Sequence, residues 1–239
     1  RRQRQMCIRD RLTSIKQNSV APPPTNVLPT VTTENDTFND EGTSTSGWTA
    51  GNATLLQTGS VLRQTKITGG SNSSMIKTIS SFPPNNEDFI LYGKVKAKNA
   101  TNCVSVLWLL NGSKEFSIWF GTTDGTGTYT SQAISIVGTV GNNSYSKLQL
   151  ESSYDFEANW YEFALHYDYK FSTLECYTRG ANGKWTYKGR VACDYFSAST
   201  IDLYTTSGSP AGNWIEFDYL TLAQPNLAVI GDSITACLL

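Results

Sequence analysis

Hydrophobic and polar residues alternate in short runs along most of this chain, from about residue 54 to residue 223. A period of two predicts strands that bury one side and expose the other. Turn-forming pairs such as Asn111-Gly112 and Asn182-Gly183 separate the runs. No segment shows a helical period of useful length. We therefore predict strands near 54–57, 60–68, 74–80, 88–98, 102–110, 114–121, 129–137, 145–151, 159–168, 172–178, 184–192, 199–205 and 213–223.

The alternation also predicts which side chains face the core. The inward set comprises Phe116, Ile118, Phe120, Tyr161, Phe163, Leu165, Tyr167, Ile215, Phe217 and Tyr219. In "GKWTYKGRV" one face carries Trp185, Tyr187 and Val191. Glu162, His166 and Asp168 are expected on an outward, polar face. Trp119 also points outward, beside Glu115 and Ser117. Because each strand has one apolar and one polar face, two sheets should pack face to face.

Thirteen short strands at this spacing predict an all-β, antiparallel sandwich or jelly roll. With its closing phrase "NWIEFDYLTLAQPN", the segment 31–224 resembles a concanavalin-like (laminin-G-like) jelly-roll module. Sandwiches of this type often bind carbohydrate, so the resemblance implies a polysaccharide or glycan partner. A fold alone does not establish that function.

Three tryptophans are candidate ligand-binding residues: Trp119, Trp160 and Trp214. A large aromatic on an outer face needs a reason. For Trp119 one reason is a stacked sugar ring, and the commoner one is a loop folded over it. Trp160 and Trp214 stand at strand starts, which leaves their role open.

The first thirty residues differ from the rest. Residues 1–20 carry six basic residues and one acid, and 21–30 form a proline-rich linker. We expect 1–30 to be a disordered tail. Its stretch "QMCIRDR" resembles translated sequencing-adapter sequence, which would make this end non-native. A solvated basic tail is the alternative. From Val31 to Ala50 the chain is polar, with Phe38 and Trp48 as expected core anchors.

The amino-acid composition limits the classes of partner that this protein is expected to bind. Charged residues make up 16% of the chain and the net charge is −1, which argues against nucleic acid. No run of eighteen apolar residues predicts a membrane span. The five cysteines are scattered, and no cysteine or histidine cluster predicts a metal site. A two-residue turn at 182–183 would set Cys176 opposite position 189, so a bridge to Cys193 is disfavoured. We expect no cofactor.

The pattern changes at Pro225. "LAVI", residues 227–230, is a continuous apolar run, as in a parallel strand buried on both faces. Gly231, Asp232 and Ser233 follow, where a tight turn could present a serine at a helix start. Free backbone N–H groups at such a position stabilise an oxyanion. An ordinary serine in a strand–turn is the alternative.

"VIGDSIT" resembles the first sequence block of the SGNH (GDSL-type) hydrolases. The resemblance implies a flavodoxin-like α/β domain in which Ser233 is the nucleophile. Gly231 and Asp232 would shape the turn, and the N–H of Ser233 would contribute to the oxyanion hole. The later blocks that supply the family's acid and base are absent. The one histidine, His166, precedes Ser233, whereas the family's base follows it. We expect His166 and Asp168 to form a solvated strand surface instead.

We therefore interpret the chain as the N-terminal part of a serine esterase, truncated at 225–239 and itself inactive, whose parent deacylates carbohydrate through an acyl-enzyme. The alternative is a non-enzymatic carbohydrate-binding or adhesive module of a cell surface or phage tail. A spacer that positions the hydrolase is a third possibility. The parent would be extracellular or surface-associated, although no signal peptide is visible.

Overall fold

A computed structural model describes residues 31–36, 47–58, 61–82, 87–125, 129–141, 144–180, 183 and 185–224. All regular elements in these ranges are strands. Their bounds are β1 Val31–Asp36, β2 Trp48–Gly51, β3 Ala53–Thr58, β4 Val61–Lys66, β5 Ser73–Phe82, β6 Phe89–Ala97, β7 Ser105–Asn111, β8 Lys114–Thr122, β9 Tyr129–Val140, β10 Ser144–Glu151, β11 Tyr161–Asp168, β12 Thr173–Arg179, β13 Trp185–Ala192, β14 Ala198–Thr205 and β15 Trp214–Gln224. Each predicted strand has a counterpart, whereas β1 and β2 were not predicted.

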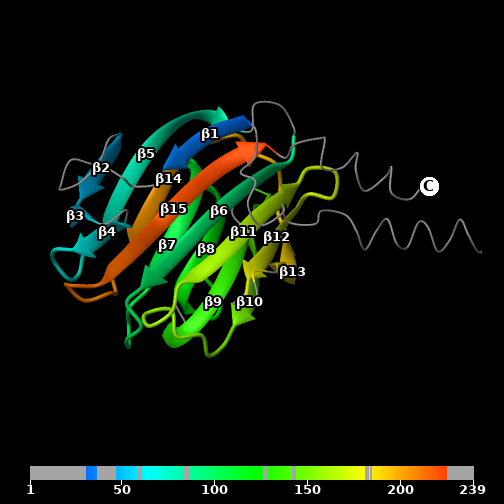
Figure 1. Cartoon of the computed structure of the whole chain (residues 1–239). Helices are drawn as coiled ribbons and strands as arrows, with labels where there is room; N and C mark the ends of the chain where they lie inside the picture. Colours follow the sequence, from blue (N-terminus) through cyan, green and yellow to red (C-terminus); the bar gives the residue numbers. More distant parts are fainter. Residues whose placement is uncertain are drawn as a thin grey trace, which may run out of the picture. The chain divides into compact units, whose positions relative to one another are not determined.

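The strands form two antiparallel sheets that pack as a jelly-roll sandwich. Sheet A has the order β13-β12-β11-β6-β15-β4-β3, and β1 pairs with β15 beside this path. Sheet B has the order β10-β9-β8-β7-β14-β5-β2. Figure 1 shows β15, β6 and β11 in the front layer, with β7, β8 and β9 behind them. The all-β, antiparallel prediction is confirmed.

The core lies between the sheets and is rich in aromatic rings. Phe116 stacks on Phe196 with ring centroids 4.0 Å apart, and Phe89 meets Phe116 edge-on at 4.9 Å. The inward set predicted from β8 and β11 is buried throughout. Trp48 also lies in this core, as expected, whereas Phe38 lies outside the described residues. Burial of apolar area is the main force that holds the two sheets together.

Two β-bulges reverse the predicted inward or outward orientation of some side chains. A bulge in β15 between Phe217 and Tyr219 turns Tyr219 to the outer face, and Leu220 takes the core position. A bulge between β12 and β13, after Cys176, separates Tyr187 from Val191 in the same way. Val191 is therefore in the core, while Trp185 and Tyr187 lie on the outer face of sheet A. One extra residue in a strand moves every later side chain of that strand to the opposite face of the sheet, and the alternation of the sequence does not reveal it.

The register of β12 against β13 sets Cys176 opposite Gly189, the predicted position, because the bulge after Cys176 shifts the pairing by one residue from that next to the turn. Cys103, Cys176 and Cys193 are free thiols. Burial raises the pKa of Cys176 and Cys193 far above the usual range of a thiol. These thiols therefore behave as small apolar core residues.

Candidate functional site

The outer face of sheet B carries a cluster of three aromatic rings. Trp119 on β8 points away from the core, as predicted, and is half-buried. Trp108 on β7 meets it edge-on with centroids 5.7 Å apart, and Tyr204 on β14 lies 4.2 Å from Trp108. Val106 pairs with both Trp119 and Tyr204 in the strand register and is fully buried beside the rings. We call Trp108, Trp119 and Tyr204 the aromatic face.

Each of the two explanations for an outward Trp119, a stacked sugar ring and a loop folded over the ring, agrees with part of what the structure shows. Its indole Nε1 donates a hydrogen bond to Ser117 Oγ at 2.9 Å. The loop after β8 also reaches the ring, since a Cβ on Gly125 would lie 3.7 Å from its Cδ1 and Nε1 atoms. The ring nevertheless stays partly exposed. The loop thus fixes one edge of Trp119 and leaves part of the ring open to a ligand.

A buried carboxyl group adjoins the aromatic face. Asp202 on β14 pairs with Trp108 in the register and is only 5% exposed. Its Oδ1 atom has no hydrogen-bond partner, and neither has Trp108 Nε1. Burial raises the pKa of Asp202 to about 7, against a backbone hydrogen bond from Met75. Asp202 and Trp108 thus bring one unpartnered acceptor and one unpartnered donor to adjacent strands, and buried groups of this kind need a partner.

A second carboxyl group lies further along the same face. Glu115 on β8 is 8% exposed, and burial raises its pKa to about 7, although Ser117 and Lys147 oppose the shift. Strand β7 lies between β8 and β14, so two strand spacings of about 4.8 Å separate the backbones that carry Glu115 and Asp202. At that separation we treat Glu115 and Asp202 as two separate acids rather than a pair that shares a proton.

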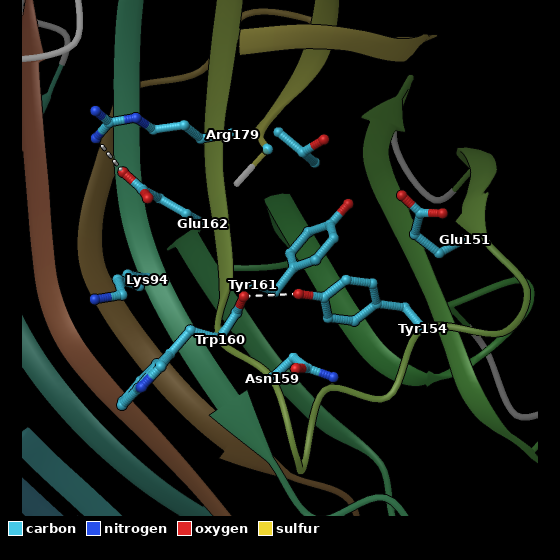
Figure 2. A pocket seen from close by; sticks show the side chains of 10 residues that line it. Lys94, Glu151, Tyr154, Asn159, Trp160, Tyr161, Glu162 and Arg179 are labelled. Atoms are coloured by element: carbon cyan, nitrogen blue, oxygen red, sulfur yellow. Dashed lines mark hydrogen bonds and ion pairs between the residues drawn. The ribbon is translucent and has the colours of Figure 1, made fainter. Parts of the chain in front are cut away.

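A pocket of about 550 Å³ lies where β11 begins and β10 and β12 end. Figure 2 shows Trp160, Lys94, Glu162 and Arg179 on one side of the start of β11, with Tyr161, Tyr154 and Glu151 on the other. The Tyr154 hydroxyl donates to the carbonyl of Trp160 at 2.7 Å. The ammonium groups of Lys94 and Lys96 each lie 5.3 Å from the centroid of a Trp160 ring. We call this cavity the Trp160 pocket.

Trp214 belongs to neither place. It lies on the outer face of sheet A, with the Arg63 guanidinium 4.5 Å from its ring centroid. Arg63 Nε also donates to Glu216 Oε2 at 2.7 Å. This cation–π contact already occupies the ring. The structure therefore distributes the three predicted tryptophans among three sites.

Sequence reasoning missed Trp108, Tyr204 and Asp202. The signal was present, because "SVLWLLN" sets Trp108 opposite Leu107 and Leu109. In the same way "STIDLYT" sets Asp202 and Tyr204 on one face. What local pattern cannot supply is that β14 lies beside β7, since the two strands are far apart in the chain.

The predicted solvated surface at His166 and Asp168 is wrong. His166 is 1% exposed and Asp168 is 7% exposed. The imidazole lies between two carboxylates, with Nε2 3.7 Å from Asp88 and Nδ1 3.6 Å from Glu175. Burial alone would lower the pKa of His166, but Asp88 and Glu175 outweigh it and raise the value. The group is an ion-pair cluster in sheet A, in which His166 and Glu175 are buried and Asp88 is partly exposed.

Ser233, Gly231 and Asp232 lie outside the described residues. In the described ranges no group of three or more His, Cys, Asp or Glu side chains is arranged to hold a metal ion. Within those same ranges no helix is long and apolar enough to cross a membrane.

The fold is that of concanavalin-like jelly-roll sandwiches, as comparison with solved structures shows. A β-glucanase of Bacillus licheniformis matches with a TM-score of 0.56 and 14% identity, over 82% of this chain and 99% of that one. A β-1,3-1,4-glucanase (lichenase) from a mouse hindgut metagenome matches with a TM-score of 0.54 and 11% identity, over 80% and 98% of the two chains.

A CBM2 module of a phage protein also has a similar structure. The CBM2 module of the evolved Dit protein of Lactobacillus casei BL23 phage J-1 matches with a TM-score of 0.51 and 11% identity, over 80% of this chain and 94% of that one. No family model and no curated protein matches this chain. At sequence identities of 11–14% the similarity shows the fold alone, so the function has to be inferred from the site.

Proposed function

We propose that this sandwich is a carbohydrate-recognition module and that the aromatic face of sheet B is its binding surface. The observation that carries the proposal is the placement of Trp108, Trp119 and Tyr204 beside the unpartnered Asp202 Oδ1 and Trp108 Nε1. Aromatic rings offer an apolar face to the C–H side of a sugar, while a nearby donor and acceptor bind its hydroxyl groups. The glucanases and the phage module of the same fold support this ligand class.

Asp202 and Trp108 suggest how the sugar is held. Asp202 and Trp108 are cross-strand neighbours, so Asp202 Oδ1 would accept a hydrogen bond from a ligand hydroxyl group and Trp108 Nε1 would donate one once the side chains that cover these two buried atoms move aside. A charge-assisted hydrogen bond of this kind is stronger than a neutral one. The rings would orient the sugar and contribute stacking energy, and the carboxylate would contribute a hydrogen bond.

A glycan array on the full chain tests the proposal. We expect the protein to bind neutral polysaccharides, with β-1,3-1,4-glucan as the first probe, and Trp119→Ala to weaken binding at least tenfold (about 1.4 kcal/mol). A broad array without a hit would refute recognition and favour the spacer.

We further propose, as the second candidate, that residues 226–239 begin an SGNH-type serine hydrolase domain that acts on acylated carbohydrate. The run "VIGDSIT", with Ser233 as nucleophile, supports it. The reaction would form an acyl-enzyme on Ser233 that water releases.

Turnover of p-nitrophenyl acetate tests this second candidate. The 239-residue chain should be inactive, whereas a chain extended along its native gene should turn over the ester and lose activity on Ser233→Ala. Ser233-dependent turnover by the 239-residue chain would contradict the expected lack of a base and an acid, and an inactive extended chain would contradict the hydrolase.

A further inference from the structure

Lys66 on β4 is a buried cation without an acid beside it. It shares the inward face of β4 with the core residue Leu62 and is only 1% exposed. In the part of the chain that the structure describes, its ammonium group forms no ion pair with a carboxylate. Removing a charge from water costs free energy unless polar groups compensate for the lost hydration. A lysine at this position therefore needs polar partners inside the protein.

Three backbone carbonyl groups of one loop are those partners. Lys66 Nζ donates to the carbonyl oxygen of Thr206 at 2.6 Å and to that of Ser209 at 2.8 Å. The carbonyl oxygen of Ser207 lies 3.4 Å from the same nitrogen. Because an ammonium group carries three N–H donors, one lysine can satisfy all three acceptors. Hydrogen bonds from a charged donor are also stronger than neutral ones.

The backbone of Lys66 binds the other end of the same loop. Its N–H group donates to the carbonyl of Asn213 at 2.8 Å, and its carbonyl accepts from the N–H group of Gly212 at 2.9 Å. The loop 206–213 joins β14 to β15. A single residue of β4 thus holds both ends of this connection.

The loop also borders the aromatic face. Tyr204 and Trp119 flank Val106 in the register of sheet B. One step further along the strands, the N–H group of Thr206 donates to the carbonyl of Val104 at 3.3 Å. The two rings therefore lie in the last row of the sheet before the loop. Movement of the loop would reach Tyr204 first.

We propose that Lys66 is a positioning residue for the aromatic face. Its buried ammonium group holds the loop 206–213, and the loop keeps the end of β14, with Tyr204, in place for a glycan. The effect on binding rests on the proposed carbohydrate recognition, whereas the hold on the loop is a property of the free protein. The positive charge is required, because an apolar side chain of similar length offers the three carbonyl oxygens no donor.

Amide hydrogen exchange of the full chain tests the hold on the loop, with Lys66→Met as the variant. Methionine retains much of the apolar volume and removes all three donors. We expect the amides of Ser209 and Gly212 to exchange at least about tenfold faster than in wild type, the factor of one hydrogen bond to a charged group. Gln64→Met is the matched control, because Gln64 is also buried on the inward face of β4 and donates to Ser73 instead. It should leave exchange in the loop unchanged.

Chemical rescue of Lys66→Ala separates charge from packing. The substitution deletes the atoms of an n-propylammonium ion, and a cavity of that kind can bind a small molecule that fits it. We expect n-propylammonium chloride to restore slow exchange in the loop, and 1-propanol, its neutral counterpart, to leave exchange fast. If the variant does not fold alone, refolding in each compound makes the same comparison. Equal rescue by propanol, or no rescue by the ammonium ion, would overturn the role of the charge.

Retardation in gels that contain β-1,3-1,4-glucan tests the effect on binding. Lys66→Met should bind about threefold to tenfold more weakly than wild type, the cost of ordering one loosened side chain, and Gln64→Met should bind like wild type. Unchanged affinity of Lys66→Met would overturn the positioning role. Wild-type exchange rates in that variant would overturn the hold on the loop, with or without glucan binding. If wild type binds no glucan while the variant exchanges faster, the proposed recognition fails and the hold on the loop stands.

Discussion

At the scale of single residues, His166 shows how a polar strand pattern can be buried. Its neighbours on the outer face of sheet A include Asp88, Asp168, Glu175, Tyr177 and Arg190. Alternation correctly put His166 on this face. It could not reveal burial, because burial depends on side chains from β6 and β12 that flank β11 in space.

The stability of the protein should depend on His166 in a defined pH window. The pKa of His166 is raised, so its contribution is complete below the ordinary value of 6.5 and is lost as pH rises through the folded value. The pKa values of Asp88 and Glu175 are lowered, so their contribution is lost as pH falls below the ordinary 3.8 and 4.5. The cluster is therefore most stabilising between about pH 4.5 and 6.5.

Urea unfolding of His166→Gln at pH 5.5 and at pH 9 measures this window. We expect the substitution to cost about 3 kcal/mol at pH 5.5, because it leaves two carboxylates without their cation. The cost should be smaller at pH 9. An equal cost at both pH values would show that His166 acts through packing rather than charge.

Asp202 should behave in the opposite sense. Its pKa is raised to about 7, so the charged form opposes folding, and this penalty grows as pH rises from the ordinary value of 3.8 to about 7. Asp202→Asn should therefore raise the free energy of unfolding by about 1–3 kcal/mol at pH 8 and change it little at pH 3.5. The same variant should lose affinity for glucan. A variant that is not stabilised at pH 8 would contradict a buried carboxylate with one unpartnered oxygen.

At the scale of elements, periodicity predicted the strands well and the bulges not at all. The facing of β8 and β11 followed from alternation, since both strands keep the predicted inward set in the core. Tyr219 was misplaced because it follows an extra residue in β15. Trp185 and Tyr187 were wrongly assigned to the same face as Val191 because an extra residue in β13 lies between them and Val191. Strands β1 and β2 were missed because their sequences are polar, and pairing with β15 and β5 forms them.

The end of β8 depends on one glycine. Gly121 has φ +92, and a Cβ there would lie only 2.0 Å from the carbonyl oxygen of Cys103. Gly121→Ala should therefore cost more than about 3 kcal/mol, since a backbone atom must move. Gly112→Ala is the matched control, with φ +61 and open space around the new Cβ. It should cost only about 1 kcal/mol. Thermal unfolding of both variants makes the comparison, and equal losses would contradict the predicted clash.

At the scale of the whole molecule, the sandwich could be predicted but the site could not. Strand number and turn spacing define an all-β fold without any knowledge of which strands pair. The aromatic face needs that knowledge, because it is assembled from β7, β8 and β14, and β14 lies between β7 and β5. Of the three rings, Trp119 alone was predicted from the sequence, as an aromatic residue on a polar face.

Affinity electrophoresis in gels that contain soluble β-1,3-1,4-glucan tests the central claim most directly. The full wild-type chain should be retarded. Trp108→Ala should migrate as in a glucan-free gel, because the substitution removes the ring that joins Trp119 to Tyr204 and the free indole N–H. Trp214→Ala, on the outer face of the other sheet, should be retarded like wild type. Equal retardation of Trp108→Ala and wild type, with both folded, would contradict the assignment of carbohydrate recognition to the aromatic face.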